Sequence, residues 1–430
     1  MAGKAPFLKT QYSAYRHRHV PSEDIGLTHV GPDTPCGEYM RRFWQPICYS
    51  DELKDLPVAV KILGEELVAF RDGRGVVGLL ERHCPHRGTS LEFGLVGAKG
   101  IRCCYHGWLF DVDGTILETP GEPVDSTLKS RLCHGAYPVH EAHGLVFGYM
   151  GPPEQIPTFP TYDSFNRTGH RLMPGQKYFY PCNWLQILEN AMDPVHTAFL
   201  HTIVSGAVFT GEFGVLPELE FVETPVGMIY IATRRVGNNV WARMVENVLP
   251  NLQQVAPIWE NGQTAHSFSG PMMSRWIVPL DDTNTMLIEL RHLSETKGVA
   301  PDWWEDRNVM LPGQLGADSY EEGQRRPGDF EAQVSQRPIA VHGLEHLGAT
   351  DRGITMFRNQ LRRGIRATSK GADPVGVSRS GGLIPTYCND TVVCVPPAET
   401  PQLDKKLLRE TGRQLAQSYI EMPPLMAAAE

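Results

Sequence analysis

The 430-residue sequence lacks an apolar run long enough to cross a membrane, because no stretch approaches the roughly 20 apolar residues that a spanning helix needs. Its N-terminus also lacks the apolar core of a secretory signal, so we expect a cytoplasmic protein without a membrane partner. Basic residues are not in excess, with 40 Lys and Arg against 49 Asp and Glu, which argues against a nucleic-acid partner. Long repeats and low-complexity tracts are missing as well. With membrane-spanning, nucleic-acid-binding and repeat proteins disfavoured, we expect an ordinary globular protein.

Cysteine and histidine are the residues that stand out. Nine cysteines, an odd number, are scattered along the chain, which does not fit a disulfide framework. Sixteen histidines accompany them, and imidazole is the most common metal ligand in proteins. The chain is 41% hydrophobic and long enough for several domains. We therefore expect a multidomain protein that uses metal or redox chemistry.

The order of apolar runs and turn residues predicts an α+β protein. From about Val58 to Phe147 short apolar runs alternate with tight-turn residues, which is typical of a small antiparallel β unit. The prolines of residues 152–160 disfavour both helix and central strand, so we place a domain boundary there. Residues 182–201 have the composition of a buried helix, interrupted by Pro194.

The rest of the chain predicts a β-rich stretch followed by helices. Residues 218–293 show partial alternation and end in a hairpin with the turn DDTNT at 281–285. Helical periodicity follows at Asp329–Leu347 and at Leu403–Ile420.

The sharpest motif is a pair of Cys and His residues on two loops of the β unit. Cys84 and His86 form a C-x-H pair, and Cys103 and His106 form a C-x-x-H pair beyond it. Two thiolates and two imidazoles can hold either a zinc ion or a two-iron two-sulfur cluster, and the spacing alone does not separate them. A glycine lies one or two residues past each histidine, where the backbone turns and exposes amides toward the site. Cys104 is a second thiol on the later loop, but the C-x-x-H spacing selects Cys103.

The two motifs, CPHRG and CYHGW, resemble the signature of Rieske domains. The FDVDG turn and the upstream MRRFWQPICYSDEL segment resemble the oxygenase subunits of Rieske non-heme iron aromatic hydroxylases, in particular the phthalate dioxygenase-like group. This resemblance implies a Rieske 2Fe-2S cluster. It also implies an N-terminal segment at 1–40 that packs on the catalytic domain, a Rieske domain at 41–154, and a catalytic domain at 155–430. The catalytic domain is expected to be a curved antiparallel sheet flanked by helices.

A second motif, Asp193-x-x-His196-x4-His201, lies in the buried segment 182–201. Two imidazoles and a carboxylate form the facial triad that binds iron(II) and leaves positions open for oxygen and substrate. On an ideal helix the two histidines would lie about 140° apart, too far round to share one ion. We expect Pro194 to bend the helix and so to change the relative direction of the two histidines.

The resemblance separates the roles of the carboxylates. Asp193 matches an aspartate that is not a ligand in the family, but bridges the Rieske histidine of a neighbouring subunit to an iron-bound histidine. A carboxylate bonded to a ligand imidazole fixes its tautomer and orientation, which gives such a bridge a physical reason. Asn190 and Glu189 lie one turn earlier. Asn190 could bond water or substrate at the iron, and the alternative is that Asn190 and Glu189 face solvent.

The third iron ligand matches Asp329, an aspartate that opens a late helix ahead of the EHLG segment. Pro327-Gly328 stands here in place of the polar pair that often precedes this aspartate. The competing carboxylates are Glu322, Glu331 and Glu345. The predicted mononuclear Fe(II) site is therefore His196, His201 and Asp329.

The resemblance implies a terminal oxygenase with O2 as co-substrate and an aromatic, carboxylated substrate. O-demethylation of a methoxylated aromatic acid is the nearest alternative. A non-catalytic Rieske electron carrier or zinc-stabilised interaction protein is the alternative of another class. Because the chain carries no G-x-G-x-x-G fingerprint beside these motifs, electrons from NADH or NADPH require a separate reductase, with a ferredoxin in a three-component system. Transfer between subunits implies a homotrimer or stacked trimers.

Three arginines in the β-rich stretch, Arg234, Arg235 and Arg243, could bind a substrate carboxylate bidentately. Ordinary exposed strand residues are the favoured interpretation of all three.

Overall fold

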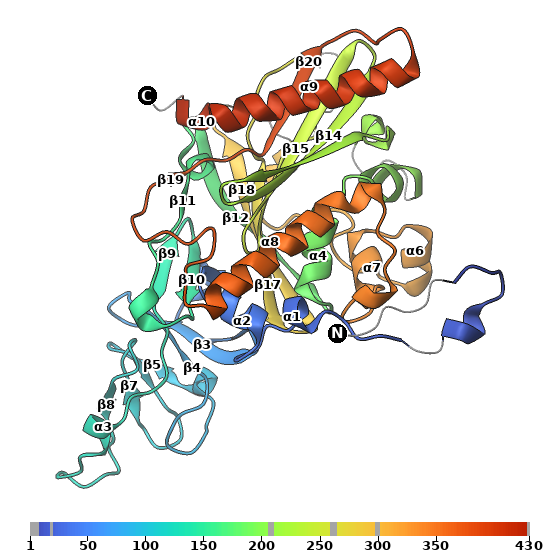
Figure 1. Ribbon diagram of the computed structural model, residues 1–430. Helices are drawn as coiled ribbons and strands as arrows, with labels where there is room; N and C mark the ends of the chain where they lie inside the picture. The colour runs from blue at the N-terminus through green and yellow to red at the C-terminus, as the bar shows by residue number, and fades with distance from the viewer. Residues whose placement is uncertain (1–7, 18–19, 205–209, 259–264, 297–301, 428–430) are drawn as a thin grey trace.

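The computed structural model describes residues 8–17, 20–204, 210–258, 265–296 and 302–427. Parts of the predicted N-terminal segment, residues 1–7 and 18–19, lie outside these ranges. A smaller β-rich part, blue to green in Figure 1, sits at one end of a larger part that is built on a single sheet. Within the described ranges, no helix has both the length and the apolar character needed to span a membrane.

Two short helices ahead of the smaller part pack onto the larger one. They are α1 (Ile25–Thr28) and α2 (Pro35–Met40), and the side chain of Thr34 caps α2 by accepting from the amide of Gly37. The fully buried Tyr39 of α2 packs on Gly364 of α8 (Arg352–Ser369). A Cβ at position 364 would lie 2.4 Å from the tyrosine ring, so only glycine allows this approach.

The smaller part consists of three antiparallel sheets, as the alternating runs predicted. Their strands in spatial order are β1 (Trp44–Tyr49), β10 (Leu145–Tyr149) and β9 (Val139–Ala142); β2 (Val58–Ile62), β3 (Glu65–Arg71) and β4 (Val77–Glu81); and β5 (Leu95–Val96), β6 (Ile101–Arg102), β7 (Leu109–Phe110) and β8 (Ile116–Glu118). Helix α3 (Leu128–Arg131) follows β8. The two Cys/His loops leave β4 and β6, and Cys84 and Cys103 belong to a small apolar core of their own.

The larger part is built on an eight-stranded antiparallel sheet in the order β12-β18-β17-β16-β15-β14-β13, with β20 paired to β15. The strands are β12 (His170–Tyr180), β13 (Glu218–Thr224), β14 (Gly227–Val236), β15 (Asn239–Val248), β16 (Leu252–Val255), β17 (Met273–Asp281), β18 (Asn284–Ser294) and β20 (Asn389–Cys394). The predicted hairpin is confirmed, since β17 and β18 pair across the DDTNT turn. A short parallel pair joins β11 (Thr161–Tyr162) to β19 (Leu383–Ile384).

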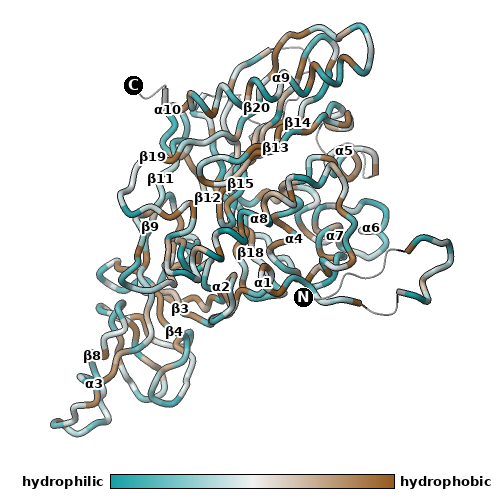
Figure 2. Tube along the Cα trace, viewed as in Figure 1, coloured by the Kyte–Doolittle hydropathy of each residue, from teal (hydrophilic) through white to brown (hydrophobic). Residues whose placement is uncertain are grey.

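Helices cover both faces of this sheet (Figure 1). Ile229 and Ile231 of β14 face α9 (Pro401–Glu421), whereas Tyr230 and Ala232 belong to the main core with α4 (Trp184–Asn190) and α8. Figure 2 shows hydrophobic residues gathered along these strands, while the segment around α6 (Tyr320–Arg325) is hydrophilic. The chain ends in α10 (Pro424–Ala427). The predicted α+β architecture and the C-terminal helix are confirmed.

Two helix predictions were wrong in detail. Residues 182–201 do not form one bent helix: α4 ends at Asn190, α5 spans only His196–Ala198, and a π-helical turn, η6 (Phe199–Val204), follows. The expected helix from Asp329 to Leu347 stops early, since α7 covers only Asp329–Val334. Arg337 lies at a φ of +83° and Pro338 follows it, which ends regular helix there. Helix α8 was not predicted.

Candidate metal centres

The structure brings His196, His201 and Asp329 together, from two segments 128 or more residues apart. One ligand atom of each residue lies within 4.8 Å of those of the other two. The Nε2 atoms of His196 and His201 lie 3.7 Å and 3.4 Å from Oδ1 of Asp329. Two imidazoles and a carboxylate aimed at one point match the donor set of a non-heme iron(II) site.

The segment between the two histidines passes into a π-helical turn that contains His201. Residues five apart lie on the same side of a π-helix, because its hydrogen bonds join residues i and i+5. Residues 199–204 adopt this conformation directly after His196–Ala198, and the two imidazole centroids are 5.2 Å apart. The expected bend at Pro194 does not lie between the two histidines, since Pro194 precedes His196 in the break after α4.

The imidazole of His196 is oriented by Asp193. Its Nδ1 bonds to the backbone carbonyl of Asp193, so Nε2 carries the lone pair that faces Asp329. Burial lowers the pKa of His196, which favours the neutral ring that a metal requires. The Asp193 carboxylate accepts a 2.8 Å bond from the amide of Val195, and its Oδ2 lies 3.9 Å from Nδ1 of His196. Its side chain is 31% exposed, so it lies between the histidine and the surface.

Asp329 is held as a carboxylate. Burial raises its pKa, but His201, His196 and Arg275 outweigh that effect and lower it overall. Its Oδ2 accepts a 2.5 Å bond from Nε2 of Gln314. Its Oδ1 is buried and accepts no hydrogen bond in the described part of the chain, although the histidines face it. An unpartnered buried carboxylate oxygen between two imidazoles fits a bound cation.

The competing carboxylates are engaged elsewhere. Glu331 accepts from the amides of Gly328 and Ala317, and Glu322 lies on the exposed helix α6. Glu345 and Glu189 both pair with Arg358. Glu189 is therefore buried and does not face solvent.

Asn190, the last residue of α4, is partly buried. No side-chain hydrogen bond is found for it within the described ranges, so its role at an iron stays a prediction.

The two Cys/His loops have the same backbone design. The amide of Cys84 donates to the carbonyl of Thr89, and the amide of Gly88 donates back to Cys84. Cys103 repeats this pattern with Trp108 and Gly107. Both glycines have a φ of +75°, which favours glycine. Cys103, not Cys104, therefore occupies the position equivalent to Cys84.

Burial divides the cysteines in the same way. Cys84 and Cys103 are 2% and 3% exposed, whereas Cys104 is exposed. Burial, together with the neighbouring Cys103, raises the pKa of Cys84 to about 11, so this thiol needs a metal to become a ligating thiolate. The rings of His86 and His106 are 4.5 Å apart, and Nδ1 of His86 is buried without a partner. These four residues fit a cluster with two thiolate and two imidazole ligands.

The arginines of the β-rich stretch are not ordinary exposed residues, so that interpretation was wrong. Arg235 pairs with Asp404. Arg234 and Arg243 are 1% and 5% exposed, and both guanidinium groups lie against the ring of Phe213. Arg234 donates to the carbonyl of Val215 and to Thr197, the residue after His196.

Arg243 has protein acceptors as well. It donates to Tyr230 and to the carbonyls of Ala256 and Pro257. The two buried arginines thus line the side of the sheet that faces the triad, and protein oxygens already engage them.

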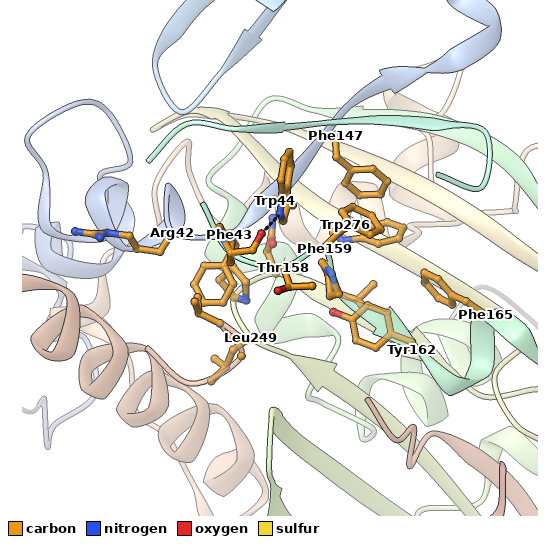
Figure 3. Close-up of a pocket in the computed structure, with 17 residues that line it drawn as sticks. Arg42, Phe43, Trp44, Phe147, Thr158, Phe159, Tyr162, Phe165, Leu249 and Trp276 are labelled. Carbon is orange, nitrogen blue, oxygen red and sulfur yellow. Dashed lines mark hydrogen bonds between the residues drawn. The ribbon is translucent and has the colours of Figure 1, made fainter. Parts of the chain in front are cut away.

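A cavity at the junction of the two parts is a separate feature (Figure 3). Aromatic side chains surround it, including Trp44, Phe147 and Trp276, and Trp44 donates to the carbonyl of Pro157. Its volume of about 40 Å³ is far below the roughly 300 Å³ of a small ligand pocket. None of the candidate metal ligands lines it, so we do not assign substrate binding to it.

The fold joins a Cys/His loop domain, whose four residues fit an iron–sulfur cluster, to a sheet domain with two histidines and a carboxylate that fit an iron(II) ion. Comparison with known proteins identifies the class further. Residues 43–130 match the Rieske [2Fe-2S] domain.

The chain is 45% identical to the tert-butanol monooxygenase / tert-amyl alcohol desaturase oxygenase subunit of Aquincola tertiaricarbonis, covering 94% of this chain and 91% of the relative. It is 38% identical to the phenoxybenzoate dioxygenase subunit alpha of Ectopseudomonas oleovorans, covering 88% and 93%. The solved structure of Pseudomonas putida CBB5 NdmA with caffeine shares the fold, with a TM-score of 0.60 at 19% identity over 78% of this chain and 94% of that one. The chain belongs to the Rieske non-heme iron oxygenases, as an oxygenase subunit of that family.

Proposed function

We propose that His196, His201 and Asp329 hold the mononuclear iron and that Cys84, His86, Cys103 and His106 hold the Rieske cluster. The observation that carries the iron site is the convergence of two Nε2 atoms on the unpartnered Oδ1 of Asp329. The shared design of the two Cys/His loops supports the cluster site.

When bound, the two metal centres supply the one-electron transfers and the oxygen activation that the protein side chains cannot perform. The chain itself orients the ligands. The carbonyl of Asp193 holds His196 in the tautomer with a free Nε2, and Gln314 holds one oxygen of Asp329.

Asp193 is proposed as the bridge through which a neighbouring subunit's cluster reaches this iron. Its partly exposed carboxylate lies beside the Nδ1 side of His196, a position from which a second subunit can contact it. This role requires an oligomer, and we propose a homotrimer or stacked trimers. The electrons are proposed to come from NADH or NADPH in the cytoplasm through a partner reductase, with a ferredoxin in a three-component system.

The proposed reaction is hydroxylation of an aromatic substrate, with O-demethylation as the alternative outcome. The 38% identical relative, a phenoxybenzoate dioxygenase subunit alpha, supports an aromatic substrate. A carboxylate on that substrate has weaker support, because protein oxygens already engage Arg234 and Arg243. A second candidate is a small tertiary alcohol, which the name of the 45% identical relative suggests.

The metal sites are tested by counting iron and acid-labile sulfide, together with electron paramagnetic resonance of the reduced protein. About three irons and two sulfides per chain are expected, with a Rieske signal. His196→Ala should lose the mononuclear iron and all turnover while the Rieske signal survives. Loss of the cluster in this variant, or a full complement of three irons, contradicts the assignment. Zinc or a single iron pair in the native protein would favour an interaction protein or an electron carrier.

The substrate class is tested with a reductase and three sets of compounds: aromatic acids, methoxylated aromatic acids and tertiary alcohols. A ring diol or phenol supports hydroxylation of an aromatic substrate, and formaldehyde supports O-demethylation. Turnover restricted to tertiary alcohols would replace the aromatic proposal with the second candidate.

A further inference from the structure

The two oxygens of the Asp329 carboxylate lie in different surroundings. Oδ2 accepts a 2.5 Å hydrogen bond from the amide of Gln314, whereas Oδ1 faces the Nε2 atoms of His196 and His201 and accepts no hydrogen bond in the described chain. The residue is 6% exposed, so water does not equalise the two oxygens. One oxygen is committed to the protein and the other is left for a ligand.

The orientation of the Gln314 amide follows from its other contacts. Its Oε1 lies 3.2 Å from the hydroxyl of Tyr180 and 3.2 Å from Nη1 of Arg275, and both groups donate. With two donors at the oxygen, the NH2 end must face Asp329. Burial raises the pKa of Tyr180 well above its usual value, so the hydroxyl keeps its proton.

Arg275 is itself held in place from the sheet. Its Nε donates a 2.6 Å bond to Gln253, the residue directly opposite on the neighbouring strand β16. Gln314 comes from a stretch without regular secondary structure ahead of α6. Contacts with β12 and β17, through Tyr180 and Arg275, are therefore what fix the glutamine beside the carboxylate.

We propose that Gln314 is a positioning residue for the mononuclear metal. Gln314 holds Oδ2 of Asp329, so that the carboxylate offers only Oδ1 to the metal. A carboxylate that binds through a single oxygen would leave more of the metal's positions open for oxygen and substrate than a bidentate carboxylate would. This inference rests on the proposed function, since it requires His196, His201 and Asp329 to be the ligands.

The test uses the full chain with its Rieske cluster, after removal of the mononuclear iron. Fe(II) affinity is measured by competition with a chelator, and nitric oxide serves as the probe for electron paramagnetic resonance of the refilled site. Gln314→Met keeps the length of the side chain but removes the amide. Gln333→Met is the matched control, because Gln333 is a 3% exposed glutamine of α7 whose Oε1 has no partner in the described chain.

Gln314→Met should weaken Fe(II) binding by about 10- to 100-fold, the usual cost of losing a group that supports a ligand, and should alter the nitrosyl signal. The Rieske signal should not change, and Gln333→Met should stay within about threefold of the native affinity. Unchanged affinity and nitrosyl signal in Gln314→Met would overturn the inference. Asp329→Ala is the reference for the site itself: if it binds Fe(II) as the native chain does, the proposed function fails instead.

A double-mutant cycle separates positioning from general packing. Tyr180→Phe removes one hydroxyl and should weaken Fe(II) binding several-fold in the native chain, because the orientation of the Gln314 amide is less restricted. In the Gln314→Met background the same change should have no further effect. Equal effects in both backgrounds would show that Tyr180 acts independently of Gln314 and would overturn the proposal that it acts by orienting the Gln314 amide.

Discussion

Arg358 of α8 joins the helix that leads to the candidate iron ligands to the rest of the catalytic part. Its Nε and Nη2 donate to both oxygens of Glu189 on α4, at 2.5 and 2.7 Å, and its Nη1 and Nη2 donate to both oxygens of Glu345, at 2.6 and 2.9 Å. Arg358 is 7% exposed and Glu189 is 8% exposed. Removing the guanidinium therefore leaves the buried carboxylate of Glu189 without its ion-pair partner.

We predict that Arg358→Met lowers the free energy of unfolding by about 3–5 kcal/mol, the usual cost of breaking a buried ion pair from one side. This corresponds to a fall in Tm of roughly 6–10 °C at the scale of a catalytic part of this size. Glu189→Gln should cost less than half as much, because Arg358 then remains paired with Glu345 in a neutral set. Thermal unfolding of proteins with matched metal content measures both values.

The loss should also depend on pH. Burial raises the pKa of Glu189, and without Arg358 only the weaker attraction of Arg362 opposes that effect. The folded variant then keeps a proton that the unfolded chain releases above a pH of about 4.3, so its stability falls as the pH rises. The slope reaches at most about 1.4 kcal/mol per pH unit between pH 5 and the raised pKa.

The control for this prediction is Arg325→Met, which breaks the exposed pair with Glu321 and should leave Tm unchanged. The reasoning is refuted if Arg358→Met behaves like this control. It is also refuted if the stability difference from the native chain is the same at pH 5 and pH 8.

Three further predictions concern the cluster, the bridge and the fold. Cys103→Ser should abolish the visible absorbance of the cluster while Cys104→Ser retains it; the opposite result would place the ligand at the exposed thiol. Asp193→Asn should keep both metals, by iron count, yet slow turnover at least tenfold, and unimpaired turnover speaks against the bridge. Gly364→Ala should cost about 1–3 kcal/mol of stability, because its Cβ would meet the ring of Tyr39 at 2.4 Å, and an unchanged Tm would contradict this packing.

The motifs in the sequence were sufficient to predict the protein class through their resemblance to Rieske domains, although their spacing alone also fits a zinc ion. CPHRG and CYHGW each need only a local turn with glycine at positive φ, and the structure forms both turns with the same backbone bonds. The alternating strands and the hairpin at 281–285 were predictable for a similar reason, since period-two patterning is a local property. Asp329 was selected through family resemblance and not from any local pattern.

Three other features could not be predicted from the sequence: the π-helical turn, the end of the helix after Asp329, and the direction of two arginine side chains. The π-helical turn after His196 replaced a predicted proline bend, because the hydrogen-bond pattern of a buried turn depends on its surroundings. The helix after Asp329 stopped at Val334, where Arg337 and Pro338 impose a different backbone path. Arg234 and Arg243 lie on neighbouring strands, and the register of the sheet decides whether their side chains point into the protein or toward solvent.

The sequence by itself thus determined two local Cys/His motifs, since the identities and spacings of Cys84, His86, Cys103 and His106 are local, and the family resemblance separated an iron–sulfur cluster from zinc. The tertiary structure decided which oxygen of Asp329 faces the histidines. That choice depends on Gln314, whose contacts come from strands that are distant in sequence. Hydrogen bonds between such segments exist only once the sheet has formed, so no local sequence pattern predicts them.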